Sequence, residues 1–198
     1  MNTALLFIHG KDGSAEEAEH YKVLFPKWDI IGFDYRSQTP WEAQSEFPDF
    51  FDKIRGRYGS VVLIAYSIGA YFAMNALSEA QIEKAYFVSP IVDMGKLISD
   101  MIQWIGASER DLQEQGTIET DFGETLSWEY LLWVKNHPIS WKVPTSVLYG
   151  SADNLQSIGT IKEFVDKTGA DLTVMENGEH WFHTKEQMAF LDDWIKER

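Results

Sequence analysis

The chain contains no cysteine, which excludes disulfide bonds, thiolate metal sites and a cysteine nucleophile. Basic residues are also scarce: 17 Lys and Arg stand against 31 Asp and Glu, for a formal net charge of -14. Nucleic acids and anionic lipid surfaces require clustered Lys and Arg, so we expect neither as a partner. The acidity is typical of a solvated surface that keeps a protein soluble.

Long hydrophobic runs are missing as well. The first apolar run, residues 4–8, is too short for a signal-peptide core or a membrane span and follows no basic leader. We therefore expect a cytoplasmic protein without a membrane span. Hydrophobic residues still make up 44% of the 198 residues, which is enough for a single domain with a sizeable core.

Six short apolar runs, separated by amphipathic stretches, predict an α/β fold. Because these runs are almost unbroken by polar residues, they are typical of strands that are buried on both faces and joined in parallel by helical crossovers. We expect about six mostly parallel strands flanked by helices. The runs cover residues 4–8, 30–33, 61–65, 85–88, 146–149 and 172–175.

One connection is much longer than a crossover helix requires. Nearly fifty residues, about 94–140, separate the fourth and fifth predicted strands. We expect a helical lid inserted into the single domain 1–198, with helices near 94–105 and 126–136. Its aromatic side chains either form the insert's own small core or line a substrate pocket. The candidate substrate-binding residues are Trp104, Trp128, Tyr130 and Trp133 of this segment, together with Tyr66.

The segment Ala65-Tyr66-Ser67-Ile68-Gly69 joins the third predicted strand to an alanine-rich helical stretch. A serine at such a junction can be held in a tight strand-to-helix turn that exposes its hydroxyl, as in a nucleophile elbow. Ser67 is therefore a candidate nucleophile. An ordinary turn serine has the same local surroundings, so the other parts of the chain must decide.

An acid and a histidine follow later strands. Asp153 comes just after the fifth predicted strand and His180 just after the sixth. Because the carboxyl ends of parallel strands meet at one edge of a sheet, we expect both side chains beside Ser67. Each has a rival: Asp93 follows the fourth strand, and His183 directly precedes the start of the last helix.

A turn bracketed by glycines, His9-Gly10-Lys11-Asp12-Gly13, follows the first predicted strand. Its glycines allow backbone N–H groups to converge without obstruction by side chains, which makes it a candidate oxyanion-binding turn. An ordinary loop between a strand and a helix is the alternative interpretation.

Together these segments resemble those of the α/β-hydrolase fold serine hydrolases, over nearly the whole chain. The resemblance implies a small, single-domain member whose central strand is 61–65. The elbow departs from the usual pattern because Ala65 replaces its first glycine. The matching motifs are the HG turn at 9–10, the elbow at 65–69, the acid turn at 150–153 and the histidine loop at 178–180.

By position, the resemblance implies a catalytic triad of Ser67, His180 and Asp153 acting on a small-molecule acyl substrate. The backbone N–H groups of Ile68 and Lys11 would form the oxyanion hole. No cofactor is implied. Two nearby histidines without a third placed ligand do not indicate a metal site.

The sequence thus predicts a serine hydrolase, similar to a carboxylesterase, that cleaves an ester or thioester through an acyl-enzyme intermediate. Two alternatives stay open: a non-catalytic binding protein with this fold, and an amide or peptide hydrolase with the same triad. The acyl group, the leaving group and the oligomeric state are not readable from the sequence.

Overall fold

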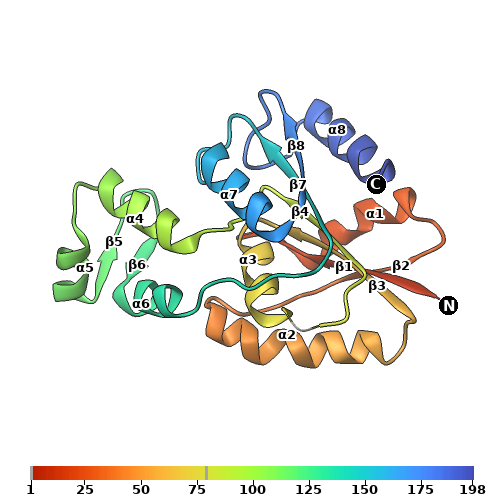
Figure 1. The fold of residues 1–198 in the computed structure, drawn as a ribbon, viewed down its shortest axis with the longest axis horizontal. Coiled ribbons are helices and arrows are strands. Elements are labelled where there is room, and N and C mark those ends of the chain that lie inside the picture. Colours follow the sequence, from red (N-terminus) through yellow and green to blue (C-terminus); the bar gives the residue numbers. More distant parts are fainter. Residues whose placement is uncertain (1, 79) are drawn as a thin grey trace. The chain divides into compact units, whose positions relative to one another are not determined.

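The computed structural model describes residues 2–78 and 80–198. Six parallel strands form one sheet in the order β2-β1-β3-β4-β7-β8 (Figure 1). Five of the six apolar runs lie within these strands, the run 30–33 extends one residue beyond β2, and the predicted fold class is confirmed. The strands are β1 (Thr3–Ile8), β2 (Asp29–Gly32), β3 (Ser60–Tyr66), β4 (Lys84–Val88), β7 (Thr145–Gly150) and β8 (Asp171–Met175).

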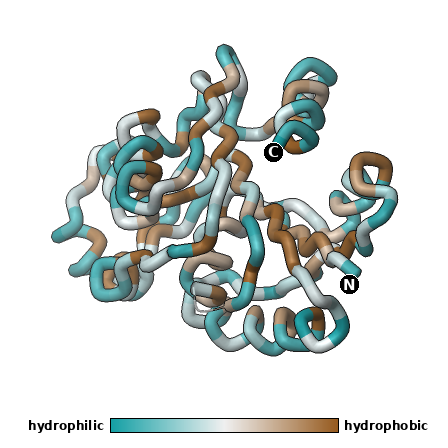
Figure 2. The backbone as a smooth tube through the Cα atoms, turned by 45° about the vertical axis from the view of Figure 1, so that its right-hand side comes forward, coloured by the Kyte–Doolittle hydropathy of each residue, from teal (hydrophilic) through white to brown (hydrophobic). Residues whose placement is uncertain are grey.

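Helices cover both faces of this sheet, which explains why the inner strands carry so few polar residues. One face packs against η1 (Ala15–Ala18), α1 (Glu19–Leu24) and α8 (Lys185–Lys196), with Tyr21 and Trp194 in its core. The other face is covered by α2 (Pro40–Arg55), α3 (Ser67–Ala76) and α7 (Ile158–Thr168) (Figure 1). Hydrophobic residues accordingly gather along the inner strands in Figure 2.

The chain between β4 and β7 forms a compact unit of its own, Asp93–Ile139, which we call the insert. The remaining unit, Met1–Val92 and Ser140–Arg198, contains the six-stranded sheet and is called the sheet unit. The insert contains α4 (Met94–Trp104), α5 (Glu109–Gln115), β5 (Thr117–Glu119), β6 (Thr125–Ser127) and α6 (Trp128–Asn136).

The sequence led us to expect a purely helical insert, but the insert also contains a β-hairpin. Leu126 pairs with Ile118 in the antiparallel hairpin β5/β6, so residues 126 and 127 are strand rather than helix. The second expected helix begins only at Trp128, because the Ser127 side chain accepts a hydrogen bond from the Tyr130 N–H and caps it. The first expected helix, 94–105, corresponds closely to α4.

No helix in the described part of the chain is both long and apolar enough to cross a bilayer.

Candidate active site

Ser67 lies at the end of β3 and is the first residue of α3. Its φ of 47° is in the left-handed region, which non-glycine residues adopt only when the surrounding structure imposes it. The turn also requires Gly69, since a Cβ there would lie 2.2 Å from the carbonyl oxygen of His9. Ala65 is completely buried, and the turn forms in spite of its extra methyl group.

The three predicted triad residues form one chain of hydrogen bonds. Ser67 Oγ lies 2.9 Å from His180 Nε2, and His180 Nδ1 lies 2.7 Å from Asp153 Oδ2. An ionised carboxylate can only accept, so Nδ1–H donates to Asp153 and Nε2 is left to accept the Ser67 O–H. The Asp153 side chain is 1% exposed and that of His180 is 16% exposed. The low solvent access strengthens the electrostatic interaction between them.

The Asp153 carboxylate is held from its other side by its own turn. Its Oδ1 accepts hydrogen bonds from the backbone N–H groups of Leu155, at 2.8 Å, and Gln156, at 3.2 Å. These bonds leave Oδ2 directed at His180. The acid is therefore oriented by local backbone geometry.

The acid turn and the histidine loop are locked together. A Cβ on Gly150 would lie 2.2 Å from the carbonyl oxygen of Gly178, so the two segments approach this closely only because residue 150 is glycine. The Ala152 N–H donates to the same Gly178 oxygen at 2.8 Å. This contact places Asp153 and His180 side by side, although 27 positions separate them in the sequence.

The glycine turn after β1 lies beside Ser67. A Cβ built on Gly10 would be 3.2 Å from Ser67 Cβ. His9 supports the turn: its Nδ1 lies 2.8 Å from the Gly10 oxygen and its ring stacks on Tyr35 with centroids 4.3 Å apart. The Tyr35 O–H donates to the His9 carbonyl, and burial raises the pKa of Tyr35 well above its usual range, so it stays a neutral donor.

The two predicted oxyanion donors belong to these neighbouring elements. Lys11 is exposed in the turn after β1, and Ile68 is the second residue of α3, directly after Ser67. Strands β1 and β3 are paired up to Ile8 and Ala65, so both turns start from the same edge of the sheet. Their role as an oxyanion hole stays a prediction.

The two rival residues have other hydrogen-bond partners. Asp93 caps α4 by accepting from the Lys96 N–H at 2.8 Å. His183 Nδ1 lies 2.7 Å from the Trp181 carbonyl oxygen and 3.6 Å from Glu179. Among the residues with described positions, no group of three or more His, Cys, Asp or Glu side chains is arranged to hold a metal ion.

No family model and no curated protein sequence matches the chain. Solved structures do match. Mouse alpha/beta hydrolase domain-containing protein 10 superposes with a TM-score of 0.77 at 15% identity, over 98% of this chain and 88% of that one. Est1E from Butyrivibrio proteoclasticus has a TM-score of 0.74 at 14% identity, over 99% and 86%. The Pyrococcus furiosus esterase Pf2001 has a TM-score of 0.65 at 17% identity, over 99% and 81%.

The protein has the α/β-hydrolase fold. The mouse protein is named for an alpha/beta hydrolase domain, and the Pyrococcus protein is named as an esterase. At identities of 14–17% the likeness is one of fold, so the chemistry must be argued from this chain's own residues.

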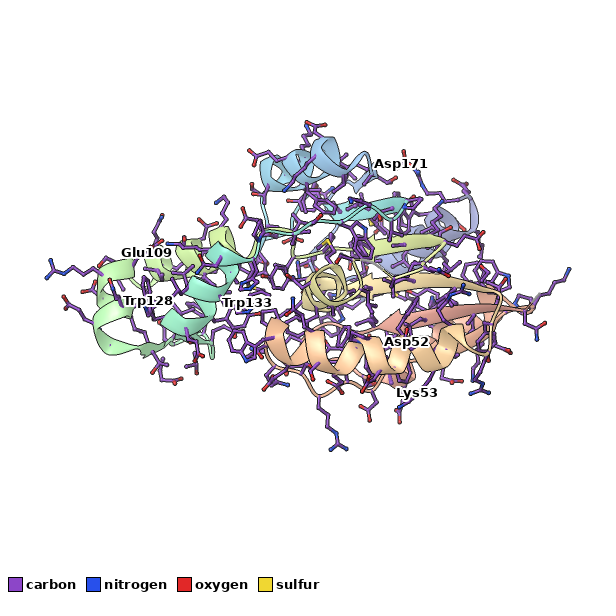
Figure 3. All side chains as sticks on the ribbon, turned by 60° about the horizontal axis from the view of Figure 1, so that its bottom comes forward. Asp52, Lys53, Glu109, Trp128, Trp133 and Asp171 are labelled. Carbon is purple, nitrogen blue, oxygen red and sulfur yellow. The ribbon has the colours of Figure 1, made fainter. Side chains whose placement is uncertain are left out.

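The four candidate aromatics of the insert are not among its fully buried side chains. Trp104 is 53% exposed, and its ring packs against the ring of Phe122, which is also exposed, with centroids 6.0 Å apart. Trp128 and Trp133 both extend from α6 (Figure 3), and Trp133 stacks on His137 at 4.1 Å. Trp128, Tyr130 and Trp133 are half-buried, whereas the fully buried side chains are aliphatic or Met. Those are Met94, Leu97, Ile98, Ile102, Leu112, Leu126 and Leu131.

Tyr66, the fifth candidate for substrate binding, has its hydroxyl 2.6 Å from that of Tyr21. Its ring packs edge-on against Phe7 at 5.5 Å. Burial raises the pKa of both tyrosines, so both hydroxyls stay neutral and share a hydrogen bond. Tyr66 thus supports the elbow from the core side, and a contact with substrate stays a prediction.

Three residues around the site were not identified from the sequence: Tyr21, Tyr35 and Gln156. Tyr35 follows the end of β2 by three residues, at the sheet edge where the other site residues were expected, and this position was a usable signal. Tyr21 and Gln156 act through hydrogen bonds to segments far away in the chain, and no local pattern marks such partners.

Proposed function

We propose that this protein is a serine hydrolase that cleaves a carboxylic ester or thioester through an acyl-enzyme intermediate. The observation that carries the proposal is the hydrogen-bonded chain from Ser67 Oγ through His180 to Asp153, with distances of 2.9 and 2.7 Å. A serine, a histidine and a carboxylate in this arrangement have the geometry that nucleophilic acyl transfer requires.

In the proposed mechanism, His180 Nε2 takes the Ser67 proton as Oγ attacks the acyl carbon. Asp153 stabilises the imidazolium that forms and keeps Nδ1–H in place. The N–H groups of Ile68 and Lys11 then stabilise the tetrahedral oxyanion, aided by the N-terminal dipole of α3. His180 returns the proton to the leaving group, and a water molecule activated in the same way releases the acyl product.

The charge of the insert bears on the charge of the acyl substrate. Between residues 94 and 140 the sequence has eight acidic and three basic residues, which opposes a strongly anionic ligand. We assign the insert the role of a lid whose aromatic side chains contact the acyl group. One structure of the similar protein Est1E is titled as having ferulic acid bound, so a hydroxycinnamate ester belongs among the substrates tested.

The test compares the wild type with Ser67→Ala on p-nitrophenyl esters of increasing acyl length, an acyl thioester, methyl ferulate and a p-nitroanilide. We expect wild-type turnover of esters or thioesters that is lost in the variant, with an optimum in acyl length. Equal background rates in the two proteins would refute the hydrolase.

A fluorophosphonate probe separates this function from its alternatives. Labelling of the wild type that disappears in Ser67→Ala supports an activated serine. Absence of labelling, together with ligand binding and no turnover, would favour the binding protein. Faster cleavage of the anilide than of the esters would favour an amide hydrolase.

A further inference from the structure

The chain leaves β4 through residues 89–92, which we call the exit segment. This segment forms hydrogen bonds with Ser67 and with the turn that contains Asp153. The Ile91 N–H donates to the carbonyl oxygen of Ser67 at 3.1 Å. The next N–H, that of Val92, donates to Oε1 of Gln156 at 3.1 Å. The exit segment therefore touches the nucleophile at one residue and the acid turn at the next.

Gln156 belongs to the turn that orients the acid. Its backbone N–H donates to Asp153 Oδ1 at 3.2 Å, and its carbonyl accepts the Tyr149 O–H at 2.9 Å. The residue is 1% exposed. A buried glutamine held at its side chain, its N–H and its carbonyl is fixed in one conformation, since losing any of these bonds leaves a buried polar group unpaired.

The exit segment is itself firmly anchored. Ser89 has a φ of 44°, in the left-handed region, and its N–H donates to the Leu148 carbonyl of β7 at 2.8 Å. Its bonds to Ser67 and Gln156 follow within three residues. These hydrogen bonds hold the exit segment in place between the end of β3 and the acid turn.

These contacts close a ring. It runs from Ser67 through the exit segment to Gln156, on to Asp153, through His180 and back to Ser67. The side chain of Gln156 is the only member of this ring that is neither backbone nor part of the triad. Its Oε1 joins the acid turn directly to the exit segment.

We propose that Gln156 is a positioning residue, which sets the placement of Asp153 and His180 relative to Ser67 by accepting the Val92 N–H. The inference rests on the proposed triad function. A small misplacement of a general base costs rate in the chemical step and leaves ground-state binding nearly unchanged. The loss should therefore appear in kcat rather than in KM.

The main variant is Gln156→Met, which keeps the chain length and removes the acceptor. We expect kcat for a p-nitrophenyl ester to fall by about tenfold or more, with KM within about twofold of wild type. Tyr149→Phe removes only the donor to the Gln156 carbonyl and is the milder variant if Gln156→Met folds poorly. It should lower kcat in the same direction by a smaller factor.

Thr39→Ala is the control for a general loss of stability, because Thr39 lies outside this ring of contacts and caps helix α2 by accepting from the Glu42 N–H. It should lower the melting temperature and leave kcat per folded molecule unchanged. A kcat within twofold of wild type in both folded Gln156→Met and Tyr149→Phe would overturn the inference.

The low-field NMR signal of the His180 Nδ1–H proton provides a readout that needs no substrate. Its assignment comes from its loss in His180→Ala. We expect this signal to shift or broaden in Gln156→Met and to stay unchanged in Thr39→Ala. An unchanged signal in Gln156→Met would refute the positioning role. If the signal shifts in Gln156→Met but the wild type shows neither turnover nor labelling by the fluorophosphonate, only the proposed function is refuted.

Discussion

Two serines end neighbouring strands of the sheet in nearly the same backbone conformation. Ser67 follows β3 with a φ of 47°, Ser89 follows β4 with a φ of 44°, and the residues before them, Tyr66 and Val88, are register partners. Ser67 is partly exposed and bonded to His180. Ser89 is 1% exposed, and its Oγ has no hydrogen-bond partner among the described residues. A left-handed backbone at the sheet edge is therefore not enough to give a serine a histidine partner.

The segment after each serine accounts for the difference. After Ser67 the chain enters α3, whose first N–H groups are available for an anion. After Ser89 it meets Pro90, which has no N–H to offer. The histidine loop also reaches only the first of the two turns in the hydrogen bonds described. Five predictions, most of them with a matched control variant, test this comparison.

The largest effect is expected for Ser67→Ala set against Ser89→Ala. Loss of the nucleophile should lower kcat/KM by up to about a millionfold, to the level of background, as for removal of a serine nucleophile in general. The same change at Ser89 removes only a buried hydroxyl and should leave kcat/KM within about twofold. Steady-state kinetics on one ester decides, and a large loss in Ser89→Ala would contradict the comparison.

Asp153→Asn should follow, with kcat about ten-thousandfold lower. The amide N–H2 would face Nδ1 of His180 and favour the wrong tautomer, so Nε2 could no longer accept the Ser67 proton. The matched control is Asp93→Asn, because Asn caps a helix as well as Asp does and α4 should be unaffected. Comparable losses in both variants would mean that the acid is misassigned.

Gly69→Ala tests the packing that only the Ser67 turn requires. A Cβ at this position would lie 2.2 Å from the His9 oxygen, so we expect the free energy of unfolding to fall by about 1–3 kcal/mol. The control is Gly159→Ala in α7, where a Cβ meets only Ser157 Oγ at 3.6 Å. It should raise the free energy of unfolding by about 0.5–1 kcal/mol. Urea unfolding measures both, and similar values would show that the close approach is unimportant.

Tyr66→Phe tests how the tyrosine pair beside the Ser67 turn affects the pH dependence of the free energy of unfolding. Burial raises the pKa of Tyr66 and Tyr21, so both stay neutral in the folded protein when the unfolded chain ionises. The resulting stabilisation is complete below the unfolded pKa of about 10 and is lost as pH rises from there through the folded pKa. The variant should lose about 1 kcal/mol at pH 7, because Tyr21 loses its hydrogen-bond partner.

Above pH 10 the free energy of unfolding of Tyr66→Phe should fall less steeply than that of the wild type. Denaturant titrations at several pH values between 7 and 12 measure both curves. Val88→Ala, at the register partner of Tyr66, is the control that should lower stability without changing the alkaline slope. Parallel curves for wild type and Tyr66→Phe would exclude the tyrosine pair as the cause.

The smallest effect is expected for Ser89→Gly. Glycine relieves the left-handed strain of about 1–2 kcal/mol, and its greater freedom in the unfolded chain offsets about half of this. The free energy of unfolding should rise by less than about 1 kcal/mol, with kcat/KM unchanged. Thermal unfolding is the measurement, and a clear loss of stability would mean that the Ser89 side chain holds the exit segment.

The sequence was most informative where a pattern is local. The unbroken apolar runs predicted β1 and β3 because a strand buried on both faces must be apolar at nearly every position. Asp153 and His180 could be placed beside Ser67 because parallel strands bring their carboxyl ends to one edge. The hairpin β5/β6 was missed because strands of three residues are too short for a recognisable period.

Contacts between distant segments were not readable. The Tyr21 and Tyr66 hydroxyls meet across 45 positions, and the Gln156 side chain reaches Val92 across 64. No local sequence pattern around Tyr21 or Gln156 predicts the distant residue to which it is hydrogen-bonded. The exposure of the insert's aromatic side chains could not be predicted either. An amphipathic pattern shows which face of a helix is apolar, but not which other segment packs against that face.

The amino-acid sequence by itself determined the α/β fold, the strand ends and the order of serine, acid and histidine, because these depend on hydrophobic runs and on turns formed by neighbouring residues. Only the tertiary structure decided which serine at the sheet edge has a histidine partner, that Asp153 rather than Asp93 bonds to it, and that Gln156 joins the acid turn to the exit segment. Those choices depend on distances between segments far apart in the chain, which the packing of the sheet and its loops sets and no local pattern encodes.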